Sequence, residues 1–277
     1  MGKRKRKQLR PAQKATSMAF CSTSGDNSAV STFVTPQGQE MPLVLEKYWR
    51  GRYNFFWRFD EGIEIDEEGW YSVTPEAIAE DTAERIAQLH NKRNATDFGR
   101  ICVIDAFCGV GGNAIKFAEW CEHVIAIDID PGRLAMARHN AEIYGVADRI
   151  EFVLGDFYQL APMLKADVVF MSPPWGGPEY TSAEVFDLEK MPFHSAQEWL
   201  DSARMASKNV VYFMPKNCDP VQLADLYPGV PCEIELNYTN GFLKAITAYY
   251  SDMALFDEGG NGNCERRVYR RSPTAPI

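Results

Sequence analysis

Acidic residues and a glycine turn form the first candidate site of this 277-residue sequence. A short apolar stretch ends in the run Asp105-Ala106-Phe107-Cys108-Gly109-Val110-Gly111-Gly112, which leads into a helical pattern. Glycines let the backbone turn tightly and approach a ligand closely, and the helix that follows adds a positive dipole. Asp128, 23 positions after the first residue of this run, stands where a carboxylate can accept both ribose hydroxyls of an adenosine-containing cofactor. Since Gly109, Gly111 and Ala114 also fit the dinucleotide pattern G-x-G-x-x-G/A, the glycines alone leave the cofactor class open.

A third acid, Asp156 in the run Gly155-Asp156-Phe157, is predicted to reach an adenine edge, with Phe157 available to pack on the ring. Asp130 is assigned instead to the N-cap of the helix that Pro131 begins, because aspartate accepts hydrogen bonds from the free N–H groups of a first turn. The candidate cofactor-binding residues are Asp105, Ala106, Cys108, Gly109, Gly111, Asp128, Asp156 and Phe157.

Taken in chain order with a fourth motif, these runs resemble the motif series of class I S-adenosylmethionine-dependent methyltransferases. The fourth motif is Ser172-Pro173-Pro174-Trp175, and it is the most specific of the series. It is similar to the [D/N/S]-P-P-[Y/W] motif of enzymes that methylate exocyclic amino groups. The resemblance implies S-adenosylmethionine as the cofactor, and a dehydrogenase would have no use for the Ser-Pro-Pro-Trp motif.

The Ser-Pro-Pro-Trp motif suits an exocyclic amine, which is a poor nucleophile because its lone pair is delocalised into the ring. The Ser172 hydroxyl and the Pro173 carbonyl are held by two proline rings of restricted φ. They can accept hydrogen bonds from the N–H groups of the amine and so help to localise its lone pair. The sulfonium is already a strong electrophile, so positioning is the main remaining task and no strong general base is needed. Trp175 offers an aromatic face to the base, with a stronger attraction if the base is cationic, as N7-methylguanine is. A buried core tryptophan is the alternative interpretation.

The elements that must position these residues alternate between strands and helices. Strands are predicted at 101–104, 123–127, 150–154, 167–171 and 209–214, and helices at 113–120, 131–144, 196–206 and from Thr74-Pro75-Glu76 onward. Continuous apolar strands separated by helices predict a parallel sheet that is covered on both faces. Asn240-Gly241 between 233–239 and 243–250 predicts an antiparallel hairpin. The expected fold class is α/β, a Rossmann-like class I methyltransferase with a mostly parallel sheet, a C-terminal antiparallel hairpin and a small N-terminal helical segment.

Charge and cysteine content exclude several classes of protein. The sequence has 29 Lys+Arg and 38 Asp+Glu, a formal net charge of −9, and seven of the bases lie before residue 15. The remainder has 22 bases against 38 acids, so any RNA must be held at a local basic patch rather than by the whole surface. No apolar run is long enough to cross a membrane. The seven cysteines are scattered without a C-x-x-C pair, so neither a zinc site nor a disulfide scaffold is expected, and no metal is assigned.

Four segments are expected along the chain. Residues 1–40 form a disordered basic arm, which is either a nuclear-localisation or phosphate-binding tail or merely a solvated end. Residues 41–73 form a helical segment rich in aromatic and basic residues, whose rings either stack a base or pack inward. Residues 74–253 form the methyltransferase domain, and residues 254–277 form a flexible tail.

Three runs taken together point to one family within this class. Tyr71-Ser72-Val73-Thr74-Pro75-Glu76, the glycine turn at 105–112 and Ser172-Pro173-Pro174-Trp175-Gly176-Gly177-Pro178-Glu179-Tyr180 closely resemble the trimethylguanosine synthase family, over roughly Lys47 to Tyr250. That family converts the 7-methylguanosine cap of small nuclear and nucleolar RNAs to 2,2,7-trimethylguanosine. The resemblance implies that Trp175 stacks the methylated guanine, that Ser172 faces the N2 amine, and that residues 41–73 close the active site. It also implies cofactor-pocket closure by Phe56 and Thr74, and substrate binding by Tyr180, Lys47, Lys216 and Asn217, the first three at the cap phosphates.

One position departs from the family pattern, since Lys216 stands where an arginine is more common before the asparagine. Lysine keeps the charge and loses the bidentate fork, which weakens this phosphate contact. Two other functions stay open: N2-guanine or N6-adenine methylation of rRNA, tRNA or DNA, and non-catalytic cap binding. The expected partners are m7G-capped RNA (snRNA, snoRNA) or a cap analogue, with snRNP or snoRNP proteins. The expected location is the nucleus or nucleolus, with the cytoplasm as a further compartment.

Overall fold

The computed structural model describes residues 31–93, 100–251 and 264–267, and the chain divides into two compact units, Met1–Arg50 and Gly51–Ile277. In the first unit, β1 (Thr32–Val34) pairs antiparallel with β2 (Glu40–Pro42), and η1 (Leu43–Leu45) and α1 (Glu46–Arg50) follow. Phe33 packs edge-on against Trp49, with ring centroids 6.1 Å apart. The expectation of a disordered arm over residues 1–40 is therefore wrong for 32–34 and 40, because the side chains of Thr-Phe-Val favour strand pairing. Residues 1–30 of that arm lie outside the described residues.

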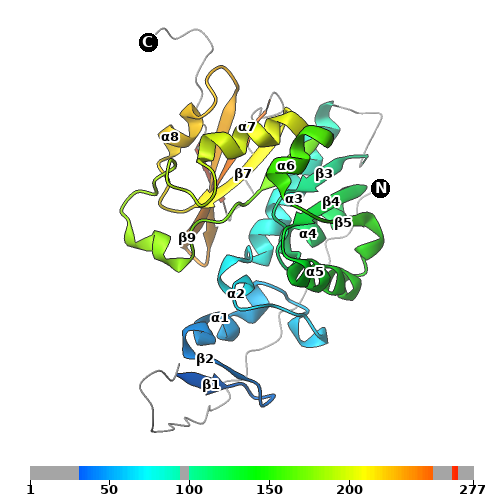
Figure 1. Ribbon diagram of the computed structural model, residues 1–277, viewed down its shortest axis with the longest axis vertical. Coiled ribbons are helices and arrows are strands. Elements are labelled where there is room, and N and C mark those ends of the chain that lie inside the picture. The colour runs from blue at the N-terminus through cyan, green and yellow to red at the C-terminus, as the bar shows by residue number, and fades with distance from the viewer. Residues whose placement is uncertain (1–30, 94–99, 252–263, 268–277) are drawn as a thin grey trace. The chain divides into compact units, whose positions relative to one another are not determined.

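An eight-stranded sheet forms the centre of the second unit (Figure 1). Its strand order is β10-β8-β9-β7-β6-β3-β4-β5. The parallel strands are β3 (Cys102–Asp105), β4 (His123–Asp128), β5 (Ile150–Leu154), β6 (Val168–Met171) and β7 (Val210–Pro215). The antiparallel strands are β8 (Cys232–Thr239), β9 (Phe242–Tyr250) and β10 (Cys264–Arg267). The predicted Rossmann-like sheet with a C-terminal antiparallel hairpin is confirmed.

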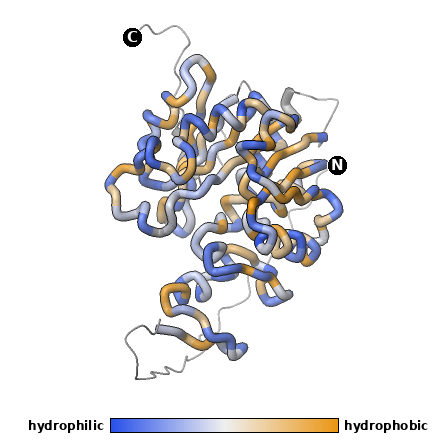
Figure 2. Tube along the Cα trace, viewed as in Figure 1, coloured by the Kyte–Doolittle hydropathy of each residue, from blue (hydrophilic) through white to orange (hydrophobic). Residues whose placement is uncertain are grey.

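Helices cover both faces of this sheet. The first face carries α3 (Glu76–Arg93), α4 (Gly112–Trp120) and α5 (Pro131–Tyr144), and the second carries α6 (Phe157–Leu160), α7 (Ala196–Ala206) and α8 (Pro220–Asp225). Val168 and Phe170 of β6 belong to one core cluster, and Val169 and Met171 belong to the other, because successive side chains of a strand point to opposite faces. Consequently β6 is hydrophobic along its whole length, and hydrophobic residues also dominate the other central strands (Figure 2).

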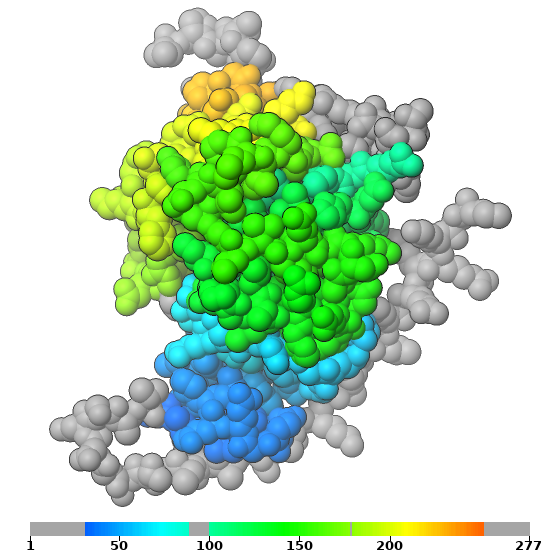
Figure 3. Space-filling model, turned by 45° about the vertical axis from the view of Figure 1, so that its right-hand side comes forward, coloured from blue at the N-terminus to red at the C-terminus, as the bar shows by residue number. Residues whose placement is uncertain are grey.

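Shorter elements complete the second unit. They are η2 (Arg52–Asn54), η3 (Phe59–Glu61), α2 (Gly69–Ser72), η4 (Ala147–Arg149), η5 (Ala161–Met163) and η6 (Pro178–Ser182). In the space-filling view, the green residues that include α5 and α6 form the surface on the viewer's side (Figure 3). The boundary between the units falls after Arg50, so the predicted segment 41–73 is split between them.

Local sequence chemistry explains where several elements begin and end. Asp130 caps α5 as predicted, since its carboxylate accepts hydrogen bonds from the N–H groups of Gly132 (2.7 Å) and Arg133 (3.0 Å). Gly145 ends α5 with φ 72°. Asn240 (φ 54°) and Gly241 (φ 79°) form the turn of the β8–β9 hairpin, as the Asn-Gly pair predicts.

One feature of the second unit departs from the sequence-based expectations, and another was not anticipated. The tail expected to be flexible over 254–277 includes β10, which pairs antiparallel with β8, while residues 254–263 and 268–277 lie outside the described part. A buried ion cluster joins α3 to β8, in which Arg85 contacts Glu233 at 2.6 Å and Glu235 at 2.8 Å. The Tyr249 ring centroid lies 3.8 Å from Arg85 Cζ, so an aromatic ring covers the guanidinium on the side of the sheet.

Candidate active site

The predicted functional residues meet at one edge of the sheet. Asp105 and Asp128 are the last residues of β3 and β4, and Asp156 follows β5 after one glycine. Ser172 follows β6 directly, and Lys216 follows β7. Because these five strands are parallel, their carboxyl ends share an edge, which is where ligands bind in doubly wound sheets.

The glycine turn between β3 and α4 is built for close approach. Gly109 (φ 51°) and Gly111 (φ 91°) have left-handed conformations that other residues rarely adopt. A Cβ at Gly111 would lie 3.2 Å from Ala137 Cα, and one at Gly112 would lie 2.8 Å from Val73 Cγ2. A Cβ at Gly109 would meet no atom within 4 Å, so the turn is packed on the α5 side and open at Gly109.

The Asp105 carboxyl is fully buried beneath this turn, and neither of its oxygens has a hydrogen-bond partner among the residues that the structure describes. Burial raises the pKa of Asp105 to about 7, an increase that the charge of Asp128 supports and the nearby N–H groups of Phe107 and Ala114 partly offset. A buried acceptor without a well-formed hydrogen bond is costly, so this carboxyl is suited to a donor or a cation that a ligand supplies.

A second unpaired acceptor, which the sequence analysis missed, lies in the first turn of α4. Asn113 is 8% exposed and donates from Nδ2 to Thr74 Oγ1 at 3.0 Å, while its Oδ1 has no partner among the described residues. Phe56 is buried beside it, with its ring 3.9 Å from a Cβ built at Gly112. The structure therefore places Phe56 and Thr74 at the glycine turn, where the resemblance implied them. The only sequence signal for Asn113 was its position directly after the last glycine of the turn.

Asp128 connects the glycine turn to the start of α5. Its Oδ2 accepts from Gly109 N at 2.8 Å and its Oδ1 accepts from Asp130 N at 2.9 Å. Burial raises the pKa of Asp128, and these two N–H groups oppose the increase. Each oxygen keeps a lone pair for a further donor, which two neighbouring hydroxyls of a ribose can supply.

The third predicted acid has a structural role that the sequence analysis did not assign. Asp156 is the N-cap of α6 and accepts from Tyr158 N and Gln159 Nε2, both at 3.0 Å. Phe157 is 2% exposed and packs edge-on against Phe107, with ring centroids 5.9 Å apart. Its ring thus belongs to the core, and a contact of either residue with adenine remains a prediction.

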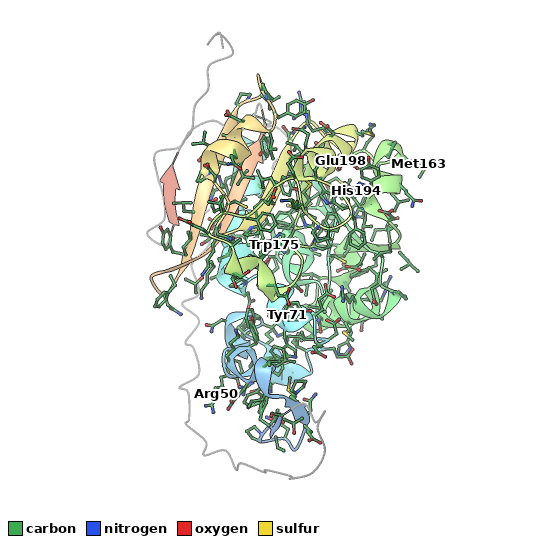
Figure 4. All side chains as sticks on the ribbon, turned by 60° about the vertical axis from the view of Figure 1, so that its left-hand side comes forward. Arg50, Tyr71, Met163, Trp175, His194 and Glu198 are labelled. Atoms are coloured by element: carbon green, nitrogen blue, oxygen red, sulfur yellow. The ribbon has the colours of Figure 1, made fainter. Side chains whose placement is uncertain are left out.

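The Ser172-Pro173-Pro174-Trp175 segment leaves β6 between the acidic strand ends and Lys216. Pro173 is buried, Ser172 is half-buried, and the Ser172 hydroxyl has no hydrogen-bond partner among the described residues. The Trp175 ring stacks on Phe213 (centroids 5.8 Å apart, planes at 29°) and meets the Tyr180 ring edge-on at 5.3 Å. Figure 4 shows Trp175 beside η6 at the strand ends, apart from His194 and Glu198 at the start of α7. Phe213, which the sequence analysis missed, therefore fixes the plane of the indole.

The segment after Trp175 is fastened to the end of β7 by Asn217. Its Nδ2 donates to the carbonyls of Tyr180 (3.2 Å) and Ala183 (3.0 Å), and its backbone carbonyl accepts from Phe186 N at 3.0 Å. Both amide hydrogens are used in this way, which leaves only the oxygen Oδ1, an acceptor that phosphate repels. The geometry favours a positioning role for Asn217 over the substrate contact that the sequence analysis assigned.

The two predicted phosphate-binding lysines lie in different units. Lys216 is exposed at the end of β7. Lys47 is exposed on α1 of the first unit, with its Nζ 4.7 Å from the Tyr48 ring centroid, and its contact with the cap remains a prediction. Within the described residues, no group of His, Cys, Asp and Glu is arranged to hold a metal ion, and no helix has the length and apolarity to span a membrane.

Comparison with known proteins identifies the family. Residues 100–253 match the family model described as RNA cap guanine-N2 methyltransferase. The chain is 39% identical over 219 residues to trimethylguanosine synthase of Schizosaccharomyces pombe, covering 76% of this chain and 87% of that protein. It is 35% identical over 235 residues to trimethylguanosine synthase of Saccharomyces cerevisiae, covering 80% of this chain and 72% of that protein. The chain belongs to the RNA cap guanine-N2 methyltransferase family.

The resemblance that the motifs carried is thereby confirmed, and the chain is a methyltransferase with S-adenosylmethionine as its cofactor. A solved structure of magnesium protoporphyrin IX methyltransferase from Synechocystis PCC 6803 with bound S-adenosylmethionine is also similar, with 17% identity and a TM-score of 0.47, covering 75% of this chain and 97% of that one. The site fits the family's cofactor, because S-adenosylmethionine has a sulfonium and an ammonium group, and Asp105 and Asn113 offer buried acceptors that lack partners.

Proposed function

We propose that this methyltransferase adds two methyl groups in succession to N2 of the 7-methylguanosine cap of RNA, which gives 2,2,7-trimethylguanosine. One observation carries the proposal. The half-buried Ser172 and the Trp175 ring, held by Phe213, follow β6 at the sheet edge that also presents the Asp105 carboxyl, whose oxygens have no partner among the described residues. The two trimethylguanosine synthases that are 39% and 35% identical to the chain support the same product.

The chain's own residues hold the cofactor at the acidic half of this edge. Asp105 and Asn113 supply acceptors for its ammonium group, Gly109 leaves room for close approach, and Asp128 accepts from the ribose hydroxyls. When bound, S-adenosylmethionine supplies a methyl group that its sulfonium makes electrophilic. Cation binding also favours the ionised form of Asp105, so its pKa falls from about 7 as the cofactor binds.

Ser172, Pro173 and Trp175 act on the guanine. The Ser172 hydroxyl and the Pro173 carbonyl accept hydrogen bonds from the N2 amine and turn its lone pair out of conjugation with the ring. Trp175 stacks on the guanine, and the N7-methyl form binds more tightly because its positive charge faces the indole π-system. The Phe213 ring behind the indole restricts its tilt, which orients the amine for in-line transfer.

The cap phosphates lie toward Lys216, on the strand next to β6. Tyr180 lies edge-on to Trp175 and contributes to the same side. The proposed substrates are small nuclear and nucleolar RNAs in complex with their proteins, and the basic run at Lys3–Lys7 supports residence in the nucleus.

The deciding experiment offers labelled S-adenosylmethionine with 7-methylguanosine triphosphate or GTP, and resolves the products by mass. The proposal expects two added methyl groups on the N7-methylated substrate and none on GTP. Ser172→Ala should lower kcat, whereas Ser182→Ala, a control on the exposed η6 whose hydroxyl donates only to Glu179 O, should not. Cofactor binding without transfer to either substrate would refute the proposal and favour a larger RNA or DNA substrate.

A further inference from the structure

The tip of the β8–β9 hairpin lies at the same sheet edge as the candidate active site. β9 runs antiparallel to β7, and the pair Pro215–Ala245 is the last in their register at the carboxyl end of β7. Lys216, directly after β7, and Lys244, on β9, are each the next residue beyond that pair. Phe242 begins β9 two residues farther out, beside the Asn240-Gly241 turn. We call Phe242 and Lys244 the tip surface.

An irregularity in the hairpin sets Lys244 apart from the ladder. Asn237 pairs with Ala245 and Tyr238 pairs with Leu243, so Lys244 has no partner residue on β8. Such a bulge re-aims a side chain, and bulges are frequent next to active sites. Lys244 is exposed, and its Nζ lies 5.9 Å from the centroid of the Phe242 ring, which is 70% exposed. A large aromatic ring and a cation are therefore presented together to solvent.

The charge of Lys244 on the tip surface, like that of Lys216, is not paired with an acidic group among the described residues. Other lysines of the second unit are engaged: Lys116 contacts three glutamates, Lys190 pairs with Asp187, and Lys165 donates to Met205 O. Lys216 and Lys244 are exposed and have no acidic partner among the residues that the structure describes. In a protein body that is acidic outside its basic arm, two such lysines on neighbouring strands form a local site for phosphate.

We propose that the tip surface binds the RNA chain beyond the cap, with Phe242 stacking on a base of the first nucleotides and Lys244 contacting a phosphate. The inference rests on the proposed function. The Trp175 ring stacks on Phe213 of β7, and Lys216 follows the end of the same strand. The tip surface belongs to the neighbouring strand β9, about 4.8 Å away, so Trp175, Lys216 and the tip surface succeed one another along this edge. That order matches the order of guanine, phosphates and first nucleotides in a capped RNA. Stacking on an aromatic ring tolerates every base, so the site binds RNA without reading its sequence.

The test compares two substrates, 7-methylguanosine triphosphate and an oligoadenylate that carries a 7-methylguanosine cap. The wild-type enzyme should have the higher kcat/KM on the capped oligoadenylate. Phe242→Ala and Lys244→Ala should each lower that value about tenfold, and change kcat/KM on 7-methylguanosine triphosphate by less than about twofold. Lys244→Ala should also reduce the salt dependence of oligoadenylate binding by about 0.7 in the log–log slope. Both residues are exposed, so the thermal midpoint should not move.

Matched controls lie at the opposite end of the sheet, where the parallel strands begin. Lys165→Ala removes a lysine that lies before β6, and Met205→Ala removes an exposed apolar side chain before β7. Neither control variant should change kcat/KM on one substrate more than on the other. The inference is wrong if the tip variants leave kcat/KM on the capped oligoadenylate unchanged, as they would if the tip bound a protein. It is also wrong if they lower kcat/KM on both substrates equally. A wild-type enzyme that fails to methylate 7-methylguanosine triphosphate would instead refute the proposed function, and the inference with it.

Discussion

Replacement of Asp105 by asparagine should stabilise the protein without cofactor and weaken cofactor binding. The Asp105 side chain is fully buried, and its two oxygens have no partner among the described residues. Asparagine has nearly the same shape and no charge, so Asp105→Asn removes the cost of burying a carboxylate. The same change removes the negative charge that we propose for the ammonium group of S-adenosylmethionine, so stability and affinity should move in opposite directions.

The magnitude follows from the pKa of Asp105, which is about 7 in the fold and 3.8 in the unfolded chain. Between about pH 4 and 7 the folded protein keeps a proton that the unfolded chain has lost, so the free energy of unfolding falls as pH rises. The total fall is about 4 kcal/mol at ~1.36 kcal/mol per pKa unit. Asparagine leaves its own amide unpaired at a cost of about 1–3 kcal/mol, so the net gain near pH 8 is about 1–3 kcal/mol.

The assay is urea unfolding of both proteins at about pH 5 and about pH 8, with calorimetry of S-adenosylmethionine binding at the higher pH. The gain in stability should be present at the higher pH and shrink to zero or reverse at the lower one, where wild-type Asp105 is mostly protonated. Affinity should fall at least about tenfold. Asp130→Asn is the control, because Asp130 is a half-buried N-cap at the same edge and asparagine caps a helix equally well. Equal destabilisation of Asp105→Asn at both pH values, or unchanged affinity, would refute the reasoning.

Three further substitutions test the site. Trp175→Ala should weaken 7-methylguanosine triphosphate binding about 10- to 100-fold and leave cofactor affinity nearly unchanged, and equal losses by calorimetry would contradict stacking. Asp128→Ala should weaken cofactor binding and spare cap binding, and an unchanged cofactor affinity would show that the ribose contact is wrong. Asn217→Ala should raise KM even for 7-methylguanosine nucleoside, because it releases the segment that carries Tyr180. A loss confined to substrates with phosphates would show instead that Asn217 contacts phosphate.

Much of the second unit could be predicted because its signals are local. The helices at 131–144 and 196–206 have the predicted bounds, since Asp130 and Ser195 cap their first turns and Gly145 ends the first of them. The predicted strands differ from the observed ones by a residue or so; 209–214, for example, is observed as Val210–Pro215. Buried parallel strands are continuous apolar runs, and such runs are visible without knowledge of their neighbours.

The parts that could not be predicted depend on residues distant in sequence. β1, β2 and β10 are three or four residues long and have meaning only through the strands with which they pair. Asn217 uses its amide on carbonyls 34 and 37 residues away, and Arg85 pairs with glutamates of β8. No local pattern marks these partners. The sequence alone does not distinguish an asparagine that binds a ligand from one that holds a loop, because the carbonyls that it contacts are known only from the fold.

The distribution of charge along the sheet edge explains how one protein can hold two ligands of opposite charge. The ends of β3 and β4 carry the carboxylates Asp105 and Asp128, which suit a cationic cofactor. The ends of β7 and β9 carry Lys216 and Lys244, which suit a polyphosphate and the RNA chain. The segment that follows β6, between these halves, is uncharged from Ser172 to Trp175. We propose that the reacting amine lies at this neutral strand end. There the carboxylates do not favour its protonation, and the lysines do not repel the sulfonium. Transfer then needs alignment of the two groups and no general base.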